Sequence, residues 1–290
     1  MDQKRAAKWG VVSQYDGVNW EDTLSTSAID NGSLCFATAK VPMSLLLAAP
    51  PQPDRITAYY ASGEVVRSRS VGGRVLTGTI DVPALPARLA ADWERDIALR
   101  LGLEAGDVEE LPLARARMRW PTFGPCVEAV VQWTHTLGLQ DVLAASDITL
   151  MACRGARYHH DGAQYGGAAF CNLFLSKDKG MDLHFPATGQ RIPLTMGTAV
   201  VFDTAQPHAV IERNNQGFHA ADFPPVRDCS QIFLTWELSI ENANVARALG
   251  IEFDVDPATA LLLDAGQVWV NGGPAVVCAQ TGRWCKPDDL

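Results

Sequence analysis

Long hydrophobic runs are missing from this sequence. The most apolar short stretch, residues 41–49, contains a proline and is far too short to cross a bilayer. The first residues are polar and charged, unlike the apolar core of a signal peptide. We therefore expect a soluble, cytoplasmic protein with no membrane partner.

Cysteine is present, but without an informative pattern. The seven cysteines are an odd number and none of them forms a Cys-x-x-Cys pair, so the sequence does not indicate a disulfide framework. Cys278 and Cys285 could pair, but free thiols are the expectation for an intracellular protein.

An excess of basic residues is also absent. The chain has 24 Lys+Arg against 33 Asp+Glu, and its net charge is −9. This balance disfavours binding to nucleic acid or to an anionic membrane. With 290 residues, 47% of them hydrophobic, the chain can bury a large core, either as one large all-β domain or as a domain with a smaller N-terminal module.

The two halves of the chain differ in their predicted elements. The first half predicts short strands at 56–60, 63–67 and 75–80 and helices at about 86–101 and 125–136. The second half predicts strands at 148–153, 168–175, 181–185, 190–194, 198–202, 208–212 and 231–238. Such a series of short strands with turn residues between them indicates a sandwich or barrel, and a double-sheet jelly roll is the economical solution.

A candidate metal-ligand set stands out in this second half. His159 and Asp161 lie two residues apart, and His208 follows about fifty residues later. Two histidines and one carboxylate form the facial triad of non-haem Fe(II) oxygenases, which leaves sites open for a chelating cosubstrate and dioxygen. Residues two apart on a strand share a face, so His159 and Asp161 could reach one metal while His160 points away. A His-x-Asp triplet occurs by chance in many proteins, and the interpretation depends on the surrounding strands.

The stretch from Arg157 to Trp236 resembles the Fe(II)/2-oxoglutarate-dependent oxygenases, especially the prolyl-hydroxylase-like branch. The matching pieces are Tyr158–Asp161, Asn172–Leu175, Asp182–Pro186, Met196–Phe202 and Pro207–Val210. The resemblance implies a double-stranded β-helix at about 146–240, between an N-terminal α+β extension (1–145) that packs on it and a C-terminal extension (241–290). Residues 1–145 match nothing that we recognise.

The resemblance also implies a cofactor and a reaction. Iron would be held by His159, Asp161 and His208, which would be the catalytic residues, and 2-oxoglutarate would chelate the metal. The family's usual reaction hydroxylates an unactivated C–H bond and releases succinate and CO2. Halogenating relatives replace the carboxylate by a small residue, so the presence of Asp161 favours hydroxylation.

The cosubstrate anchor departs from the family's pattern. The family usually places an arginine or lysine about ten residues after the second histidine, a position that here falls near Phe218 in a loop-like stretch. A guanidinium suits a distal carboxylate because it binds both oxygens. We expect Arg227 to be the anchor rather than Arg213, which would face away, and Ser230 could add a hydroxyl. By analogy, Asn172 and Tyr165 could line the cosubstrate pocket.

Three functions remain open at this point. The first is a 2-oxoglutarate-dependent oxygenase that acts on a small molecule, an amino-acid side chain or a peptide. The second is a cupin-type jelly-roll metalloenzyme that does not use 2-oxoglutarate, and the third is a non-enzymatic jelly-roll binding protein. The sequence names neither the substrate nor the oligomeric state.

Overall fold

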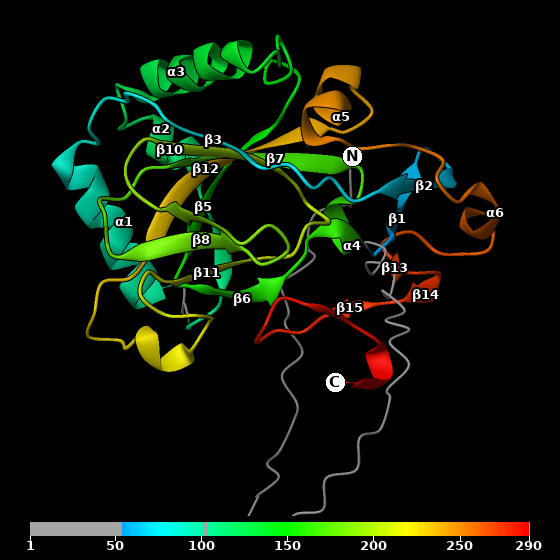
Figure 1. The fold of residues 1–290 in the computed structure, drawn as a ribbon. Coiled ribbons are helices and arrows are strands. Elements are labelled where there is room, and N and C mark those ends of the chain that lie inside the picture. The colour runs from blue at the N-terminus through cyan, green and yellow to red at the C-terminus, as the bar shows by residue number, and fades with distance from the viewer. Residues whose placement is uncertain (1–53, 101–103, 290) are drawn as a thin grey trace, which may run out of the picture. The chain divides into compact units, whose positions relative to one another are not determined.

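Two antiparallel sheets make up the core of the computed structural model, which describes residues 54–100 and 104–289 (Figure 1). The large sheet has the order β3 (Leu76–Thr79), β10 (Thr198–Asp203), β7 (Ala168–Phe174), β12 (Gln231–Ser239), β5 (Ile148–Cys153) and β4 (Val108–Leu111). The small sheet has the order β6 (Ala156–His159), β11 (His208–Glu212), β8 (Met181–Phe185) and β9 (Gln190–Pro193).

The order of the strands identifies the architecture. Along the chain, β5, β7, β10 and β12 belong to the large sheet, while β6, β8, β9 and β11 belong to the small one. The pairs between these strands are all antiparallel. This interleaving is a double-sheet jelly roll, the double-stranded β-helix, so the predicted mainly β fold with flanking helices is confirmed.

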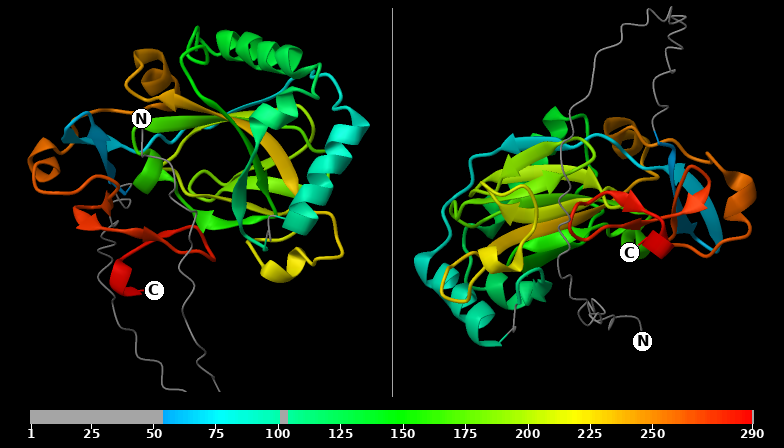
Figure 2. Two further views of the ribbon diagram at one scale, coloured as in Figure 1. Left: turned by 180° about the vertical axis from the view of Figure 1, so that it is seen from behind. Right: turned by 60° about the horizontal axis from the view of Figure 1, so that its bottom comes forward.

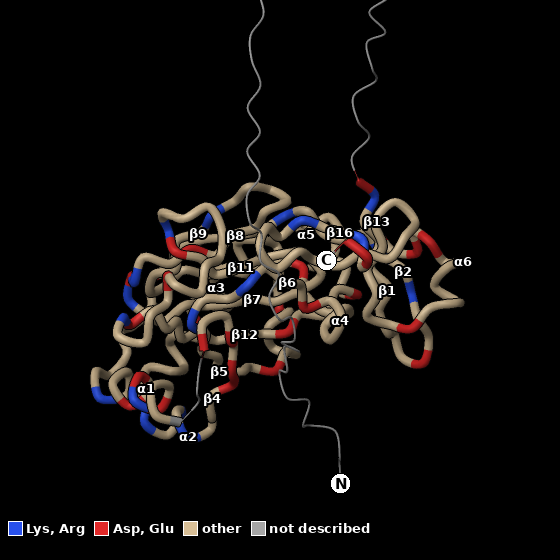
Figure 3. The backbone as a smooth tube through the Cα atoms, turned by 90° about the horizontal axis from the view of Figure 1, so that it is seen from below, with Lys and Arg blue, Asp and Glu red and all other residues tan. Residues whose placement is uncertain are grey.

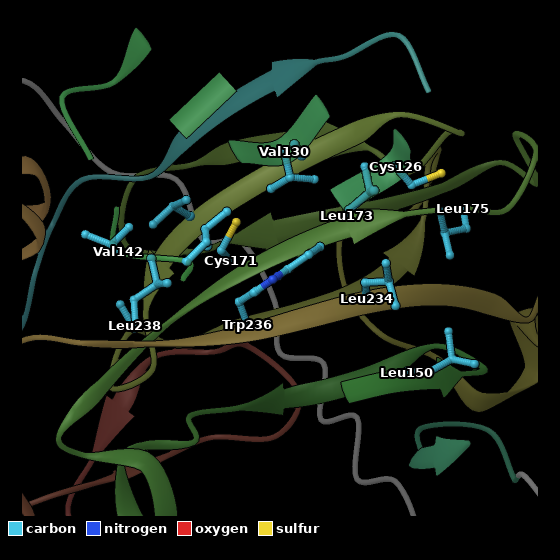
Figure 4. Close-up of a cluster of buried hydrophobic side chains, with 14 of the residues drawn as sticks. Cys126, Val130, Val142, Leu150, Cys171, Leu173, Leu175, Leu234, Trp236 and Leu238 are labelled. Atoms are coloured by element: carbon cyan, nitrogen blue, oxygen red, sulfur yellow. The ribbon is translucent and has the colours of Figure 1, made fainter. Parts of the chain in front are cut away.

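Alternation along the strands separates two hydrophobic clusters. The outward residues of the large sheet, such as Leu173, Leu234 and Trp236, pack against α1 (Ala87–Arg100) and α3 (Phe123–Thr136). Figure 4 shows this outer cluster, with Cys126 and Val130 of α3 beside Leu173. The inward residues, among them Phe170, Phe174, Phe202 and Phe233, meet Leu183 and Phe185 of the small sheet. Each buried apolar side chain contributes about 1.5–3 kcal/mol.

The two predicted helices form for a local reason. In α1, Leu89, Trp93 and Ile97 recur every four residues and are all buried, so they make one stripe that faces the sheet. In α3, Cys126, Val130 and Thr134 have the same spacing and burial. A short helix, α2 (Leu113–Arg117), lies between them in sequence.

A third sheet joins segments from the two ends of the described chain. Its order is β14 (Gly273–Pro274), β13 (Val268–Val270), β1 (Ile56–Ser62) and β2 (Val65–Ser70), and Figure 2 shows it beside the jelly roll from two further sides. The remaining elements are α4 (Gly162–Tyr165), α5 (Ala243–Leu249), α6 (Pro257–Ala260), β15 (Val276–Val277), β16 (Trp284–Cys285) and two 3-10 turns, Ala220–Asp222 and Pro287–Asp289.

The predicted N-terminal extension contributes to the core. Within it, β3 pairs with β10 and β4 pairs with β5, so both strands extend the large sheet. The part of this extension before residue 54 lies outside the described residues. None of the described helices is long and apolar enough to span a membrane. Lysine and arginine are interspersed with acidic residues over the described chain (Figure 3), and the expected lack of a nucleic-acid partner stays a prediction.

Buried thiols should be far less reactive than Cys278. The six cysteines in the described ranges are free. Burial raises the pKa of Cys126 to about 11 and that of Cys153 to about 12, whereas hydrogen bonding, chiefly to the Thr281 side chain, lowers the pKa of Cys278. Because the thiolate is the reactive form, we expect iodoacetamide at neutral pH to label Cys278 first and the buried thiols only after unfolding. Peptide mass spectrometry over time measures this, and equal labelling of Cys153 and Cys278 in the folded protein would contradict it.

Candidate metal centre

The three predicted ligands meet at one end of the jelly roll. His159 is the last residue of β6 and His208 is the first of β11, and the two are direct partners across the strands. The residues therefore share one face of the small sheet. In the part of the chain that the structure describes, His159, Asp161 and His208 form the single group able to hold a metal ion.

Asp161 reaches this group by another route than the one we expected. The strand ends at His159, and Asp161 takes the N-cap position of α4 with φ −96° and ψ 3°. The expectation that His159 and Asp161 share a strand face is therefore wrong. What positions Asp161 is a backbone hydrogen bond of 2.7 Å, which its N–H donates to the carbonyl of Thr204 in the loop before His208.

The ligand atoms converge closely enough for a single ion. One nitrogen or oxygen from each residue lies within 4.8 Å of the others. Nε2 of His159 is 3.6 Å from Oδ1 of Asp161, and Nε2 of His208 is 3.5 Å from Oδ2. His208 and Asp161 are almost fully buried, while the His159 side chain is 36% exposed, so the group is open on one side only.

Both imidazole rings are oriented by their second nitrogen. Nδ1 of His159 is 2.7 Å from the carbonyl of Arg157, and Nδ1 of His208 is 3.0 Å from that of Gln206. A carbonyl can only accept, so each Nδ1 carries the proton and each Nε2 presents a lone pair toward Asp161. Metal-binding histidines are commonly held in this way.

Burial disfavours the charged forms of the two more buried members of this group, Asp161 and His208. Desolvation raises the pKa of Asp161 above its usual value and lowers the pKa of His208 well below its own. A neutral imidazole is the form that binds a metal, and a buried carboxylate needs a cation or hydrogen-bond donors to compensate for lost water. The donor set therefore fits a divalent ion.

The remaining histidines lie outside this group. His160 receives a hydrogen bond from the N–H of Gly162 and its ring contacts that of Trp284. His184, two residues from Asp182, has Nδ1 2.5 Å from the hydroxyl of Tyr158. Both have partners that need no metal.

Of the predicted cosubstrate residues, Asn172 and Tyr165 lie nearest to the barrel interior. Asn172 is buried on β7 between the inward residues Phe170 and Phe174, and it therefore points inward by alternation. The ring of Tyr165, at the end of α4, contacts that of Phe170 with centroids 5.0 Å apart.

Arg213, Arg227 and Ser230 lie at the opposite end of the barrel. Arg213 bonds to Asp178 and Asp182, the exposed Arg227 donates to the carbonyl of Lys179, and the carbonyl of Ser230 accepts from the Lys179 ammonium.

The separation between these three residues and the triad follows from the direction and length of β8. Residues 178–180 precede β8, whereas its last residue, Phe185, contacts the His208 ring. From Gly180 to Phe185 the chain advances about 16 Å at the usual rise per residue. The structure therefore does not bring Arg213, Arg227 or Ser230 to the triad, and their role as an anchor stays a prediction.

Sequence reasoning missed Thr235 as a pocket residue. It lies opposite Asn172 across the β7–β12 pair and opposite Thr149 across the β5–β12 pair. Among the described residues, neither the Thr235 hydroxyl nor the Asn172 carbonyl oxygen has a hydrogen-bond partner, and both are buried. The sequence carried a partial signal, because Gln231, Thr235 and Glu237 are polar residues on one face of a strand that is otherwise apolar up to Leu238.

Comparison with known proteins gives similarity of structure only. No family model and no curated protein sequence matches the chain. The chain is similar in structure to prolyl hydroxylases. A viral collagen prolyl hydroxylase from Paramecium Bursaria Chlorella virus-1, in complex with 2OG, is 13% identical over 57% of this chain and 96% of its own, with a TM-score of 0.31.

Two further solved structures show the same degree of likeness. A prolyl-4-hydroxylase from Pseudomonas putida is 16% identical over 58% of this chain and 92% of its own, with a TM-score of 0.32. EvdO2 from Micromonospora carbonacea is 13% identical over 67% and 93%, with a TM-score of 0.36. Scores this low carry no assignment of activity, and the jelly roll rests on the strand order described above.

Proposed function

We propose that this protein is an Fe(II)- and 2-oxoglutarate-dependent oxygenase that hydroxylates an unactivated C–H bond of a small molecule or of an amino-acid side chain. The observation that carries the proposal is the group His159, Asp161 and His208, with ligand atoms within 4.8 Å at one end of a jelly roll. Two imidazoles and one carboxylate on one side of a metal leave positions open on the other.

The residues of this chain have separable roles in such a reaction. When bound, Fe(II) would supply the chemistry by which dioxygen oxidises both 2-oxoglutarate, to succinate and CO2, and the C–H bond of the substrate. His159, Asp161 and His208 would hold the metal, and their Nδ1 hydrogen bonds keep both imidazoles in the ligating tautomer. The Phe202 ring, 4.8 Å from that of His208, excludes water from the inner side of the site.

The barrel interior offers polar groups to a cosubstrate. A buried polar atom without a partner costs about 1–3 kcal/mol, so the orphaned atoms of Asn172 and Thr235 support a ligand between the sheets. The Thr235 hydroxyl can donate to a carboxylate, and so can the Asn172 Nδ2 group, whereas the orphaned Asn172 Oδ1 accepts and needs a donor on the ligand or a water. None of the residues on the inward face of β12 is a lysine or arginine: they are Gln231, Phe233, Thr235, Glu237 and Ser239.

Turnover of 2-oxoglutarate tests the proposed function. Purified protein with Fe(II) and 2-oxoglutarate is incubated with pools of amino acids, peptides and metabolites, and succinate is measured. We expect succinate release that requires Fe(II) and rises with one of the pools. Metal binding without 2-oxoglutarate consumption would favour the cupin-type alternative, and absence of both would favour a binding protein.

Substitutions inside the barrel should weaken 2-oxoglutarate binding. Loss of a hydrogen bond to a charged group costs about 1.5–3 kcal/mol, so we expect Asn172→Ala and Thr235→Val each to weaken binding roughly ten- to hundredfold. The measurement is calorimetric titration of 2-oxoglutarate into the Mn(II)-loaded protein, alongside its apparent constant in turnover.

Arg227→Ala is the matched comparison, because it tests the anchor that the sequence predicts. Loss of a true anchor would cost about 2–5 kcal/mol, or roughly thirtyfold or more in affinity. If Arg227→Ala weakens binding that far while Asn172→Ala and Thr235→Val do not, the cosubstrate does not occupy the barrel interior as we propose.

A further inference from the structure

Arg69 is a fully buried cation that belongs to the third sheet rather than to the jelly roll. It lies on β2, and its side chain is 0% exposed. Its guanidinium donates four hydrogen bonds: Nε to the carbonyl of Gly166 at 2.9 Å, Nη1 to Asp203 Oδ2 at 2.6 Å and to its neighbour's carbonyl at 3.1 Å, and Nη2 to Asp203 Oδ1 at 2.8 Å.

Gly166 and Asp203 belong to the two segments that carry the inner metal ligands. Gly166 is the C-cap of α4, whose N-cap is Asp161. Asp203 is the last residue of β10, and the loop that follows it leads to His208. The Asp203 carboxylate also accepts from the N–H groups of Gly72 at 2.6 Å and Ala205 at 2.9 Å.

These two segments, residues 161–166 and 203–208, also contact each other directly. The N–H of Asp161 donates to the Thr204 carbonyl, and the Thr204 hydroxyl lies 2.7 Å from the carbonyl of Tyr165. A Cβ on Gly162 would stand only 3.0 Å from that of Ala205. Because the approach is so close, a small shift of either segment changes the distance between Asp161 and His208.

We propose that Arg69 is a positioning residue of the metal centre. Its guanidinium bonds to both the Asp161 segment and the His208 segment and so fixes the distance between the two ligands. The third sheet, which carries Arg69, thereby supports the metal centre. An ion pair is not required for stability at a buried site, since an apolar pair of similar volume is often as stable. The guanidinium instead fixes the directions of its hydrogen bonds, which a lysine or an apolar residue cannot reproduce.

Metal affinity separates positioning from simple stabilisation. Co(II) alone is titrated calorimetrically into the metal-free full chain, at a temperature at which circular dichroism shows each variant folded. We expect Arg69→Lys to weaken Co(II) binding roughly 10- to 100-fold, the usual effect of losing an outer support of a metal site. The matched control is Arg67→Lys on the same strand, whose guanidinium pairs with Asp254 and Glu241 at the surface. It should change the affinity less than about twofold.

A double variant keeps the proposal testable if Arg69→Lys fails to fold. Arg69→Met combined with Asp203→Leu leaves no unpaired buried charge, although it still removes the acceptor of the Gly72 and Ala205 N–H groups. Under conditions in which circular dichroism shows it folded, we expect it to bind Co(II) as weakly as Arg69→Lys. A folded Arg69→Lys or double variant with wild-type Co(II) affinity would overturn the proposal. Since the assay needs no 2-oxoglutarate, its outcome is independent of the turnover test of the proposed function.

Discussion

Hydroxylation should fall more than about a hundredfold when Asp161 is replaced by glycine. The change removes one of the three proposed protein ligands, and this loss should exceed the 10- to 100-fold effect of disturbing an outer support of a metal site. The backbone should tolerate it, since the Asp161 side chain makes no capping hydrogen bond to α4, and glycine is accepted at an N-cap. Fe(II)-dependent succinate release measures the loss of activity, and Co(II) titration measures the loss of metal affinity.

The controls for this result come from the other histidines. His208→Ala and His159→Ala should lose metal in the same way. His184→Ala should keep it, because the contacts of His184 are with Tyr158. Near wild-type hydroxylation by Asp161→Gly, or equal losses in His184→Ala and His208→Ala, would show that the three residues are not the ligand set.

The second large effect concerns stability. Asp203→Ala should lower the free energy of unfolding by about 3–5 kcal/mol, because it leaves the Arg69 guanidinium buried without its counter-ion. It also orphans the N–H groups of Gly72 and Ala205. Chemical denaturation at neutral pH measures this change.

A partly exposed pair, Arg67 of β2 with Asp254, provides the comparison. Asp254 receives two hydrogen bonds from Arg67, and both side chains are partly exposed. Water screens such a pair, so Asp254→Ala should have a much smaller effect than Asp203→Ala. Equal effects of the two substitutions would mean that burial does not set the strength of the Arg69–Asp203 pair.

Most of the jelly roll could be predicted from the sequence because its signals are local. The predicted strands at 148–153, 181–185 and 208–212 coincide with β5, β8 and β11, since turn residues bound short runs of apolar and β-branched residues there. The spacing of Leu89, Trp93 and Ile97 likewise identified the buried face of α1. The third sheet had no such signal as a unit, because it pairs β1 with β13 across most of the chain.

For the candidate site, too, some features could be predicted from the sequence and others could not. The chemistry of a triad is carried by residue types, and His159, Asp161 and His208 could be named from the sequence. The backbone position of Asp161 could not be predicted. The strand ends at His159, and the N–H of Asp161 then bonds to the carbonyl of Thr204, more than forty residues further along the chain. The anchor prediction at Arg227 depended on counting along a strand through a loop of unknown length, and the structure places that residue at the other end of the barrel.

What the sequence determined by itself is therefore the alternation that builds two facing sheets and the donor atoms available to a metal. What only the tertiary structure decided is which distant groups meet. Arg69 and Asp203 are 134 residues apart, and neither residue is unusual in its local context. Their meeting depends on the packing of the third sheet against the ligand loops, because a buried charge is stable only where the fold brings its partner.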